Sequence, residues 1–208
     1  MPCFAAGTRV RTERGDRLVE GLEVGDIVLT GKDRRKATIV WLGYRHVSAR
    51  RHPQPENVWP VRIAAEALAD GVPARDVWLS PEHAVFLHGV LVPARHLING
   101  ATIRQIAVPE ITYWHVELAE HALLTTEGML SESYLDVGNR GDFEGLGVVA
   151  LHPDFMAPLA ALWAAKACAP QCRGGRMLEG IRQNLMRRAV RLGYSDVARN
   201  EEVVGLRA

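Results

Sequence analysis

The sequence has no apolar run long enough to cross a membrane. Its longest nearly apolar stretch, residues 155–165, is interrupted by Pro158 and ends at Lys166, short of the ~20 residues that a spanning helix needs. The amino terminus has no charged segment followed by an apolar run, so it does not resemble a secretory signal. We therefore expect no membrane partner and, by default, a cytoplasmic location.

The chain also has few cysteines and almost no net charge. The chain has 3 cysteines, an odd number that argues against a disulfide framework. Its 25 Lys and Arg residues against 24 Asp and Glu residues give a formal charge of +1, so no global field attracts nucleic acid. Hydrophobic residues are plentiful, at 48% of 208 residues, which supplies a well-buried core and excludes an intrinsically disordered chain.

From Thr8 to about Tyr134 the sequence is typical of short strands separated by turns. β-branched and aromatic segments alternate with turn-forming sequences such as Gly31-Lys32-Asp33. Many short strands without long intervening helices predict an all-β sandwich or pseudo-barrel and not a parallel sheet. Strands are expected at residues 8–12, 27–30, 37–42, 59–63, 77–79, 84–87 and 111–118, and helical turns at residues 64–68 and 94–98.

The composition changes after Asn139, where glycine-containing sequences mark a boundary. A one-sided apolar pattern beyond it predicts an amphipathic helix of about four turns, ended by Gly193. The pattern consists of Leu178, Ile181, Leu185, Ala189 and Leu192. A second helix is expected over residues 153–167. The sequence therefore predicts two parts, residues 1–140 and a helical C-terminal extension over residues 141–208.

Cys3 is the first candidate for chemistry because it stands so near the start of the chain. Its thiol can attack the carbonyl of Pro2, because the sulfur and the scissile nitrogen belong to one residue and the five-membered transition state needs no encounter. This N–S acyl shift would convert the Pro2–Cys3 amide into a thioester. The alternative is a buried cysteine that acts as a small hydrophobic side chain.

The second candidate is Ser80-Pro81-Glu82-His83, between two predicted strands. A histidine in a rigid turn can protonate the departing nitrogen near neutral pH, and Ser80 could orient either the imidazole or the scissile carbonyl. An ordinary surface or hydrogen-bonded histidine is the alternative. The third candidate is His115, which alternation places beside Glu117 on one side of a strand. It could face a shallow site or belong to a solvated polar face.

Together these segments resemble the Hedgehog/intein (Hint) superfamily, most closely its bacterial Hint-type domains outside the true inteins. Residues 3–30 resemble the opening of such domains, with a nucleophile, a strand and a Gly-Asp turn before the next strand. Residues 80–83 match a second motif, usually Thr-x-x-His, with serine in place of threonine. Residues 115–134 resemble the last motif, so that the resemblance covers roughly residues 3–134.

The resemblance implies a compact all-β fold of pseudo-two-fold β-hairpins, followed here by a small helical C-terminal extension. Carried over to this sequence, it makes Cys3 the nucleophile and His83 the proton donor to the scissile nitrogen. Ser80 becomes the hydrogen-bond partner, and His115 stands where the family often has an assisting polar residue. The substrate would be the chain's own N-terminal flanking segment, and no cofactor is implied.

Two departures from the family pattern limit which of the family's reactions this chain is expected to carry out. Glu132-Ser133 replaces the terminal His-Asn pair of inteins, so splicing is not expected, and Tyr44 replaces an aspartate of Hedgehog proteins, so sterol transfer is not expected. What remains is a single-turnover, cysteine autoprotease-like cleavage in which water or a small nucleophile resolves the thioester. Because only Met1-Pro2 precedes Cys3 here, either an upstream domain is left out of this sequence or the module serves another purpose.

Other readings stay open at this point. The same fold could be a catalytically idle scaffold or a protein-interaction module, or the basic helix at residues 176–191 could dock an acidic partner. Cys168 and Cys172, with His152 upstream, suggest a metal site, but zinc needs about four ligands, so no metal is predicted. The basic segments have few interleaved aromatic residues to stack bases, so no nucleic-acid partner is predicted.

Overall fold

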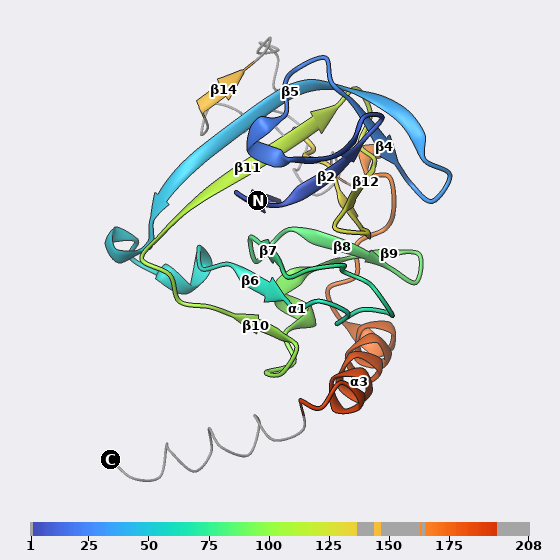
Figure 1. The fold of residues 1–208 in the computed structure, drawn as a ribbon. Coiled ribbons are helices and arrows are strands. Elements are labelled where there is room, and N and C mark those ends of the chain that lie inside the picture. Colours follow the sequence, from blue (N-terminus) through green and yellow to red (C-terminus); the bar gives the residue numbers. More distant parts are fainter. Residues whose placement is uncertain (1, 137–143, 147–162, 164, 195–208) are drawn as a thin grey trace.

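The computed structural model describes residues 2–136, 144–146, 163 and 165–194 (Figure 1). Its strands form a 14-stranded sheet with the order β10-β6-β7-β1-β11-β5-β4-β2-β12-β13-β8-β9, to which β14 is added beside β5 and β3 beside β2. In the described part of the chain these strands pair with one another in antiparallel fashion throughout. The all-β prediction is therefore confirmed.

The strands are β1 (Phe4–Ala5), β2 (Arg9–Thr12), β3 (Gly15–Leu18), β4 (Ile27–Thr30), β5 (Arg35–Ser48), β6 (Val61–Ile63), β7 (Val77–Leu79), β8 (Ala84–Leu87), β9 (Val90–Pro93), β10 (Ile103–Gln105), β11 (Glu110–Leu118), β12 (Leu123–Thr126), β13 (Met129–Glu132) and β14 (Glu144–Leu146). In the described part of the chain the helices with defined bounds are α1 (Ala94–Leu97) and α3 (Gly175–Arg191), with short 3-10 turns at Val19–Gly21, Ala49–Arg51 and Pro55–Asn57. Trp163, Ala165 and Lys166 are also helical.

Strands β5 and β11 are the two longest strands and form an antiparallel pair in the middle of the sheet order. They pair from Glu110 opposite Ser48 to Leu118 opposite Ile39, with an irregularity after Glu117, and run side by side across the molecule (Figure 1). The much shorter β1 lies between β11 and β7. This position carries the start of the chain into the middle of the sheet.

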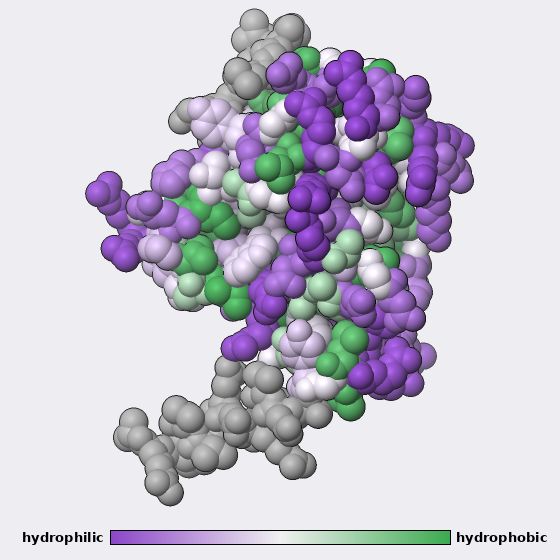
Figure 2. Space-filling view, viewed as in Figure 1, coloured by the Kyte–Doolittle hydropathy of each residue, from purple (hydrophilic) through white to green (hydrophobic). Residues whose placement is uncertain are grey.

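The main hydrophobic core joins the sheet to the C-terminal helix. Buried side chains of the strands belong to the same cluster as Leu178, Ile181 and Leu185 of α3, and each such side chain gains roughly 1.5–3 kcal/mol from its removal from water. On the face shown in Figure 2, hydrophobic residues occur only in small separate patches among hydrophilic ones. No helix in the described part of the chain is long and apolar enough to span a membrane.

The C-terminal helix is confirmed, with two differences from the prediction. α3 begins at Gly175, one turn earlier than the apolar pattern, and ends before Gly193, whose φ of 85° only glycine adopts readily. Arg188 is buried on the packed face, where it donates a hydrogen bond to the carbonyl oxygen of Glu66 and pairs with Asp70. The basic helix is thus partly a structural contact.

Local sequence signals fail where tertiary contacts decide the backbone. The helical turn expected at residues 64–68 is wrong, because Glu66 has a φ of 61°, outside the right-handed helical region. Its N–H is donated to the carbonyl oxygen of Pro73. The other predicted turn, at residues 94–98, is present as α1. The helix expected over residues 153–167 lies almost wholly outside the described residues.

Candidate functional site

Cys3 directly precedes β1, and Ser80 directly follows β7 in the next position of the sheet. The N–H of Cys3 is donated to Ser80 Oγ at 3.0 Å, and the N–H of Ser80 is donated to the carbonyl oxygen of Cys3 at 3.0 Å. Ser80 therefore holds the nitrogen of the bond that the sequence analysis marks for cleavage. The sequence predicts that Ser80 orients either the imidazole or the scissile carbonyl, whereas its hydroxyl accepts a hydrogen bond from the nitrogen of the scissile bond.

His115 lies against the Cys3 thiol. Its Nε2 atom is 3.3 Å from Sγ of Cys3, across 112 residues of sequence. Burial lowers the pKa of this imidazole, and a hydrogen bond with the backbone of Pro2 acts in the opposite direction; since proline has no N–H, the group involved is its carbonyl. His115 thus faces both the Cys3 thiol and the Pro2 carbonyl that this thiol would attack.

His115 faces neither a shallow site nor solvent, so both alternatives that strand alternation left open are wrong. The side chain is only 1% exposed, because both faces of β11 are covered from His115 to Leu118. Two aromatic rings close around it, with ring centroids 5.1 Å away for Tyr134 and 6.4 Å for Trp41. The site is an internal one.

Gly43 of β5 makes room for this aromatic wall. It pairs with His115, and a Cβ atom placed on it would lie 2.1 Å from the ring of Trp41. Trp41 in turn lies 5.2 Å from the ring of Tyr134. Tyr134 lies at the end of the last motif but had no role assigned from the sequence, and Gly43 and Trp41 were not predicted to belong to the site. An isolated glycine within a β-branched segment, a pattern that indicates close approach, was the available signal.

His83 is the third member of the candidate site. The turn that carries it is closed by a hydrogen bond from its N–H to the carbonyl oxygen of Ser80 at 3.0 Å. The ring is buried against Phe4, with centroids 4.2 Å apart. Within the described part of the chain neither ring nitrogen has a well-aligned hydrogen-bond partner, although the backbone of Cys3 is close enough to influence its pKa.

Burial sets the resting charges of these groups. Removal from water raises the pKa of the Cys3 thiol to about 11. The same cause lowers the pKa of His83 to about 3 and that of His115 to about 3. At neutral pH the site therefore holds a protonated thiol beside two neutral imidazoles, and a neutral imidazole can accept the proton of a thiol.

These buried histidines predict a loss of stability in acid. Their folded pKa of about 3 lies below the ordinary 6.5, so the unfolded chain binds more protons as the pH falls from 6.5 towards 3. Stability is then present above this interval and is lost within it, by roughly 5 kcal/mol per histidine at most. We expect denaturant unfolding measured between pH 7 and pH 3.5 to show this slope.

Glutamine variants of the two buried histidines, with an exposed histidine as the control, test this assignment. His83→Gln and His115→Gln each remove one titrating group and should flatten part of the slope. His88 is exposed and has a φ of 50°, which asparagine tolerates, so His88→Asn should leave the slope as it is. An unchanged slope in both glutamine variants would contradict the assignment.

A second buried polar group contacts the backbone of Ala84, the residue after His83. Glu132, at the end of β13, is 2% exposed, and its Oε1 accepts the N–H of Ala84 at 2.7 Å. Its Oε2 is 3.6 Å from Nε2 of His121, whose Nδ1 accepts the N–H of Cys168 at 2.9 Å. In the sequence Glu132 stands out only as a departure from a family motif, and no local pattern indicates this role.

The cysteines near the C-terminal helix have separate environments. Cys168 is exposed and Cys172 is buried, while His152 lies outside the described residues. Among residues 2–136, 144–146, 163 and 165–194, no group of three or more His, Cys, Asp or Glu side chains could hold a metal ion.

Comparison with known proteins gives one family and several similar folds. A family model described as Hint domain matches residues 2–138. Similar solved structures include the bacterial intein-like domain from Clostridium thermocellum, at 13% identity and a TM-score of 0.46, covering 64% of this chain and 99% of that one. The gp41-1 intein has 13% identity and a TM-score of 0.44, covering 63% and 98%. The MchDnaB-1 intein has 15% identity and a TM-score of 0.45, covering 63% and 99%. No curated protein matches the chain.

Proposed function

Because the chain belongs to the Hint domain family, we propose that it cleaves the peptide bond before Cys3 in cis, by an N–S acyl shift. The observation that carries the proposal is the contact of 3.3 Å between Sγ of Cys3 and Nε2 of His115. The scissile nitrogen is held at the same time by Ser80 Oγ, at 3.0 Å. Nucleophile, base and scissile bond thus meet in one buried place.

The reaction begins with proton transfer from the thiol to His115. A thiol with a pKa of about 11 is a weak nucleophile at neutral pH, so attack needs a base within hydrogen-bond reach. Sγ then bonds to the carbonyl carbon of Pro2, and a five-membered ring of sulfur, Cβ, Cα, nitrogen and carbonyl carbon forms. Because all reacting atoms belong to adjacent residues, no bimolecular encounter is needed.

Collapse of this ring breaks the carbon–nitrogen bond and leaves a thioester on Cys3. The departing nitrogen must take up a proton, and the two imidazoles can return the one that left the thiol. His83 lies beside the backbone of Cys3, so we assign it the delivery of a proton to the departing nitrogen, while repulsion from the charge of a protonated His115 disfavours charge on both imidazoles at once. The negative charge of the ring intermediate raises the proton affinity of both histidines while it exists.

Water or a small nucleophile would then resolve the thioester, which releases whatever segment precedes Cys3. Splicing is not proposed, because Ser133 follows Glu132 where inteins have a reactive asparagine. Ser133 is 0% exposed, and its backbone and hydroxyl are bonded to Ala122. The proposed product is an N-terminal cleavage fragment, made once per chain.

A trapping experiment tests this proposal. We expect a folded reporter fused ahead of Pro2 to be released on incubation, and release to be faster with hydroxylamine, which attacks thioesters far more readily than amides. Mass spectrometry should find the reporter ending in a Pro2 hydroxamate and the remaining chain beginning at Cys3. A fusion that stays intact with and without hydroxylamine would overturn the proposal.

An idle scaffold with the same fold is the second candidate. It is favoured by one observation, that Cys3 is 6% exposed and burial raises its pKa to about 11, as expected of a cysteine that serves as a small hydrophobic side chain. This candidate predicts an intact fusion under every condition of the trapping experiment, so the same measurement decides between the two.

A further inference from the structure

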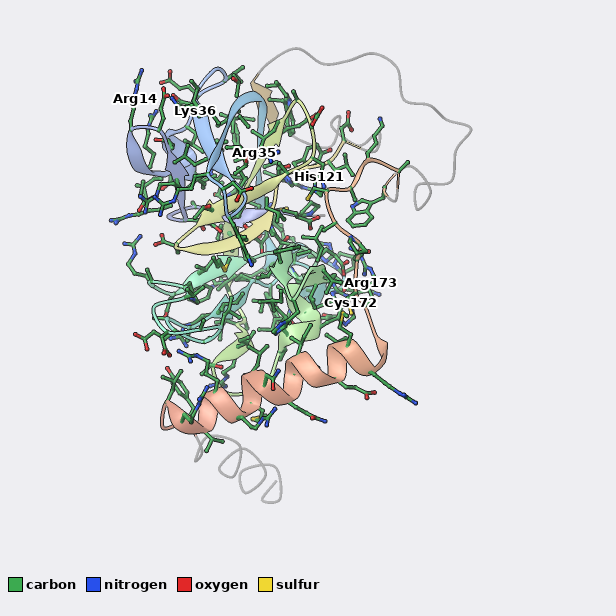
Figure 3. All side chains as sticks on the ribbon, turned by 90° about the vertical axis from the view of Figure 1, so that its right-hand side faces the viewer. Arg14, Arg35, Lys36, His121, Cys172 and Arg173 are labelled. Atoms are coloured by element: carbon green, nitrogen blue, oxygen red, sulfur yellow. The ribbon has the colours of Figure 1, made fainter. Side chains whose placement is uncertain are left out.

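The C-terminal segment at residues 168–173, which we term the strap, lies along β9 before it enters α3. The N–H of Leu91 is donated to the carbonyl oxygen of Pro170 at 2.9 Å, and the N–H of Cys172 to the carbonyl oxygen of Leu91 at 2.8 Å. Figure 3 shows Cys172 and Arg173 where this segment approaches α3, with His121 near its other end. The strap lies beyond residues 2–138, which the family model matches.

One end of the strap contacts the residue before His83. Nη2 of Arg173 is 2.9 Å from Oε2 of Glu82, and Nε of Arg95 is 2.7 Å from Oε1 of the same carboxylate. Arg95 comes from α1, within the sheet body, whereas Arg173 comes from the tail. The Glu82 side chain is thus held between a local arginine and a distant one.

The other end of the strap is connected to the residue after His83. The N–H of Cys168 is donated to Nδ1 of His121 at 2.9 Å, and Nε2 of His121 is 3.6 Å from Glu132. Glu132 in turn accepts the N–H of Ala84 at 2.7 Å. These contacts form one continuous chain of polar groups, which runs from Cys168 in the strap through His121 and Glu132 to the N–H of Ala84.

We propose that the strap positions His83, with Arg173 acting through Glu82 and the Cys168–His121–Glu132 chain acting through Ala84. This inference rests on the proposed function, in which His83 serves the departing nitrogen. Within the described residues the ring of His83 has no well-aligned hydrogen bond, so its place depends on Phe4 and on the backbone of its two neighbours. A displacement of about 1 Å at a reacting group can cost about 10²-fold in rate.

The first test measures release of the reporter in the full-length fusion. Arg173→Gln should slow release by about threefold to tenfold, because an ion pair with a half-exposed arginine contributes modestly, and Arg173→Lys should restore most of the rate. Arg176→Gln, an exposed arginine on the first turn of α3, is the matched control and should stay within about twofold of the parent. Equal rates for Arg173→Gln and the parent would overturn the proposal.

A double-mutant cycle shows whether Arg173 acts through Glu82. Combined with Glu82→Gln, the Arg173→Gln change should slow release no further, since the contact is already lost. Purely additive effects would show that Arg173 acts elsewhere. If the contact only stabilised the fold, its removal would lower the melting temperature together with the rate of release. If the contact positions His83, its removal should lower the rate of release at a nearly constant melting temperature.

Hydrogen exchange keeps the inference testable even if no release occurs. A parent fusion that stays intact refutes the proposed function, but the strap still predicts that Arg173→Gln speeds amide exchange in peptides covering residues 80–84 by about threefold to tenfold. Exchange in α3 and in β5 should be unchanged, and Arg176→Gln should resemble the parent throughout. Unchanged exchange at residues 80–84 would overturn the positioning role.

Discussion

Replacing Cys3 with alanine is expected to abolish release of a reporter fused ahead of Pro2, by more than about 10³-fold. Without sulfur no thioester forms, and hydroxylamine has nothing to intercept. The substitution removes only one buried atom from a side chain that is 6% exposed, so the fold should survive, which a thermal melt can verify. Reporter release is followed by gel and the cleavage position by mass spectrometry.

Serine at the same position provides the graded control. Cys3→Ser keeps a nucleophilic oxygen of similar size beside His115, so slow release through an ester is expected, between that of the parent and that of Cys3→Ala. Release that continues at the parent rate in Cys3→Ala, at the same bond, would show that the thiol is not the nucleophile.

Replacing His115 with glutamine is expected to slow release by about 10²- to 10⁴-fold, the usual contribution of a positioned acid or base. The pH dependence should also change. The parent rate should be nearly constant between pH 5 and pH 8, because burial keeps His83 and His115 neutral at a pKa of about 3. In His115→Gln the thiol, with its pKa raised to about 11 by burial, must ionise unaided, so the rate should rise with pH.

His46 is the matched control for that experiment. It lies on β5 in the same pair of long strands, is exposed, and contacts Thr112 and Glu110 at the surface. His46→Gln should therefore leave both the rate and its pH dependence unchanged. A parent rate with an inflection near pH 6.5, or an equal loss in both glutamine variants, would contradict the role of His115.

The sequence made the candidate site partly predictable because its members belong to compact motifs. Cys3, Ser80 and His83 were singled out from short local patterns, and the structure brings Ser80 to the nitrogen of Cys3 and the ring of His83 against Phe4. The contact of Cys3 with His115 could not be deduced, because it spans 112 residues. Its geometry depends on a two-residue strand that no periodicity could reveal.

The supporting residues were unpredictable for a related reason. Glu132 and Ala84 are 48 residues apart, and Cys168 and His121 are 47 apart, so only the folded sheet defines their contacts. Gly43 stands as an isolated glycine in a β-branched segment, which indicates a close approach but does not reveal that Trp41 makes it. β-branched strands and the apolar stripe of α3 were predictable because burial repeats along one element, whereas polar anchors occur singly.

The place of β1 has a consequence for the direction of the proposed reaction. Because Phe4 is paired on one side with Trp114 and on the other with Leu79, the newly freed amine of Cys3 could not drift away after the bond breaks. It would stay beside its own thioester and readily re-form the original linkage. Net progress would then be governed by how often an outside molecule gains entry before this reversal, so that small acceptors should be favoured over bulky ones regardless of their intrinsic reactivity.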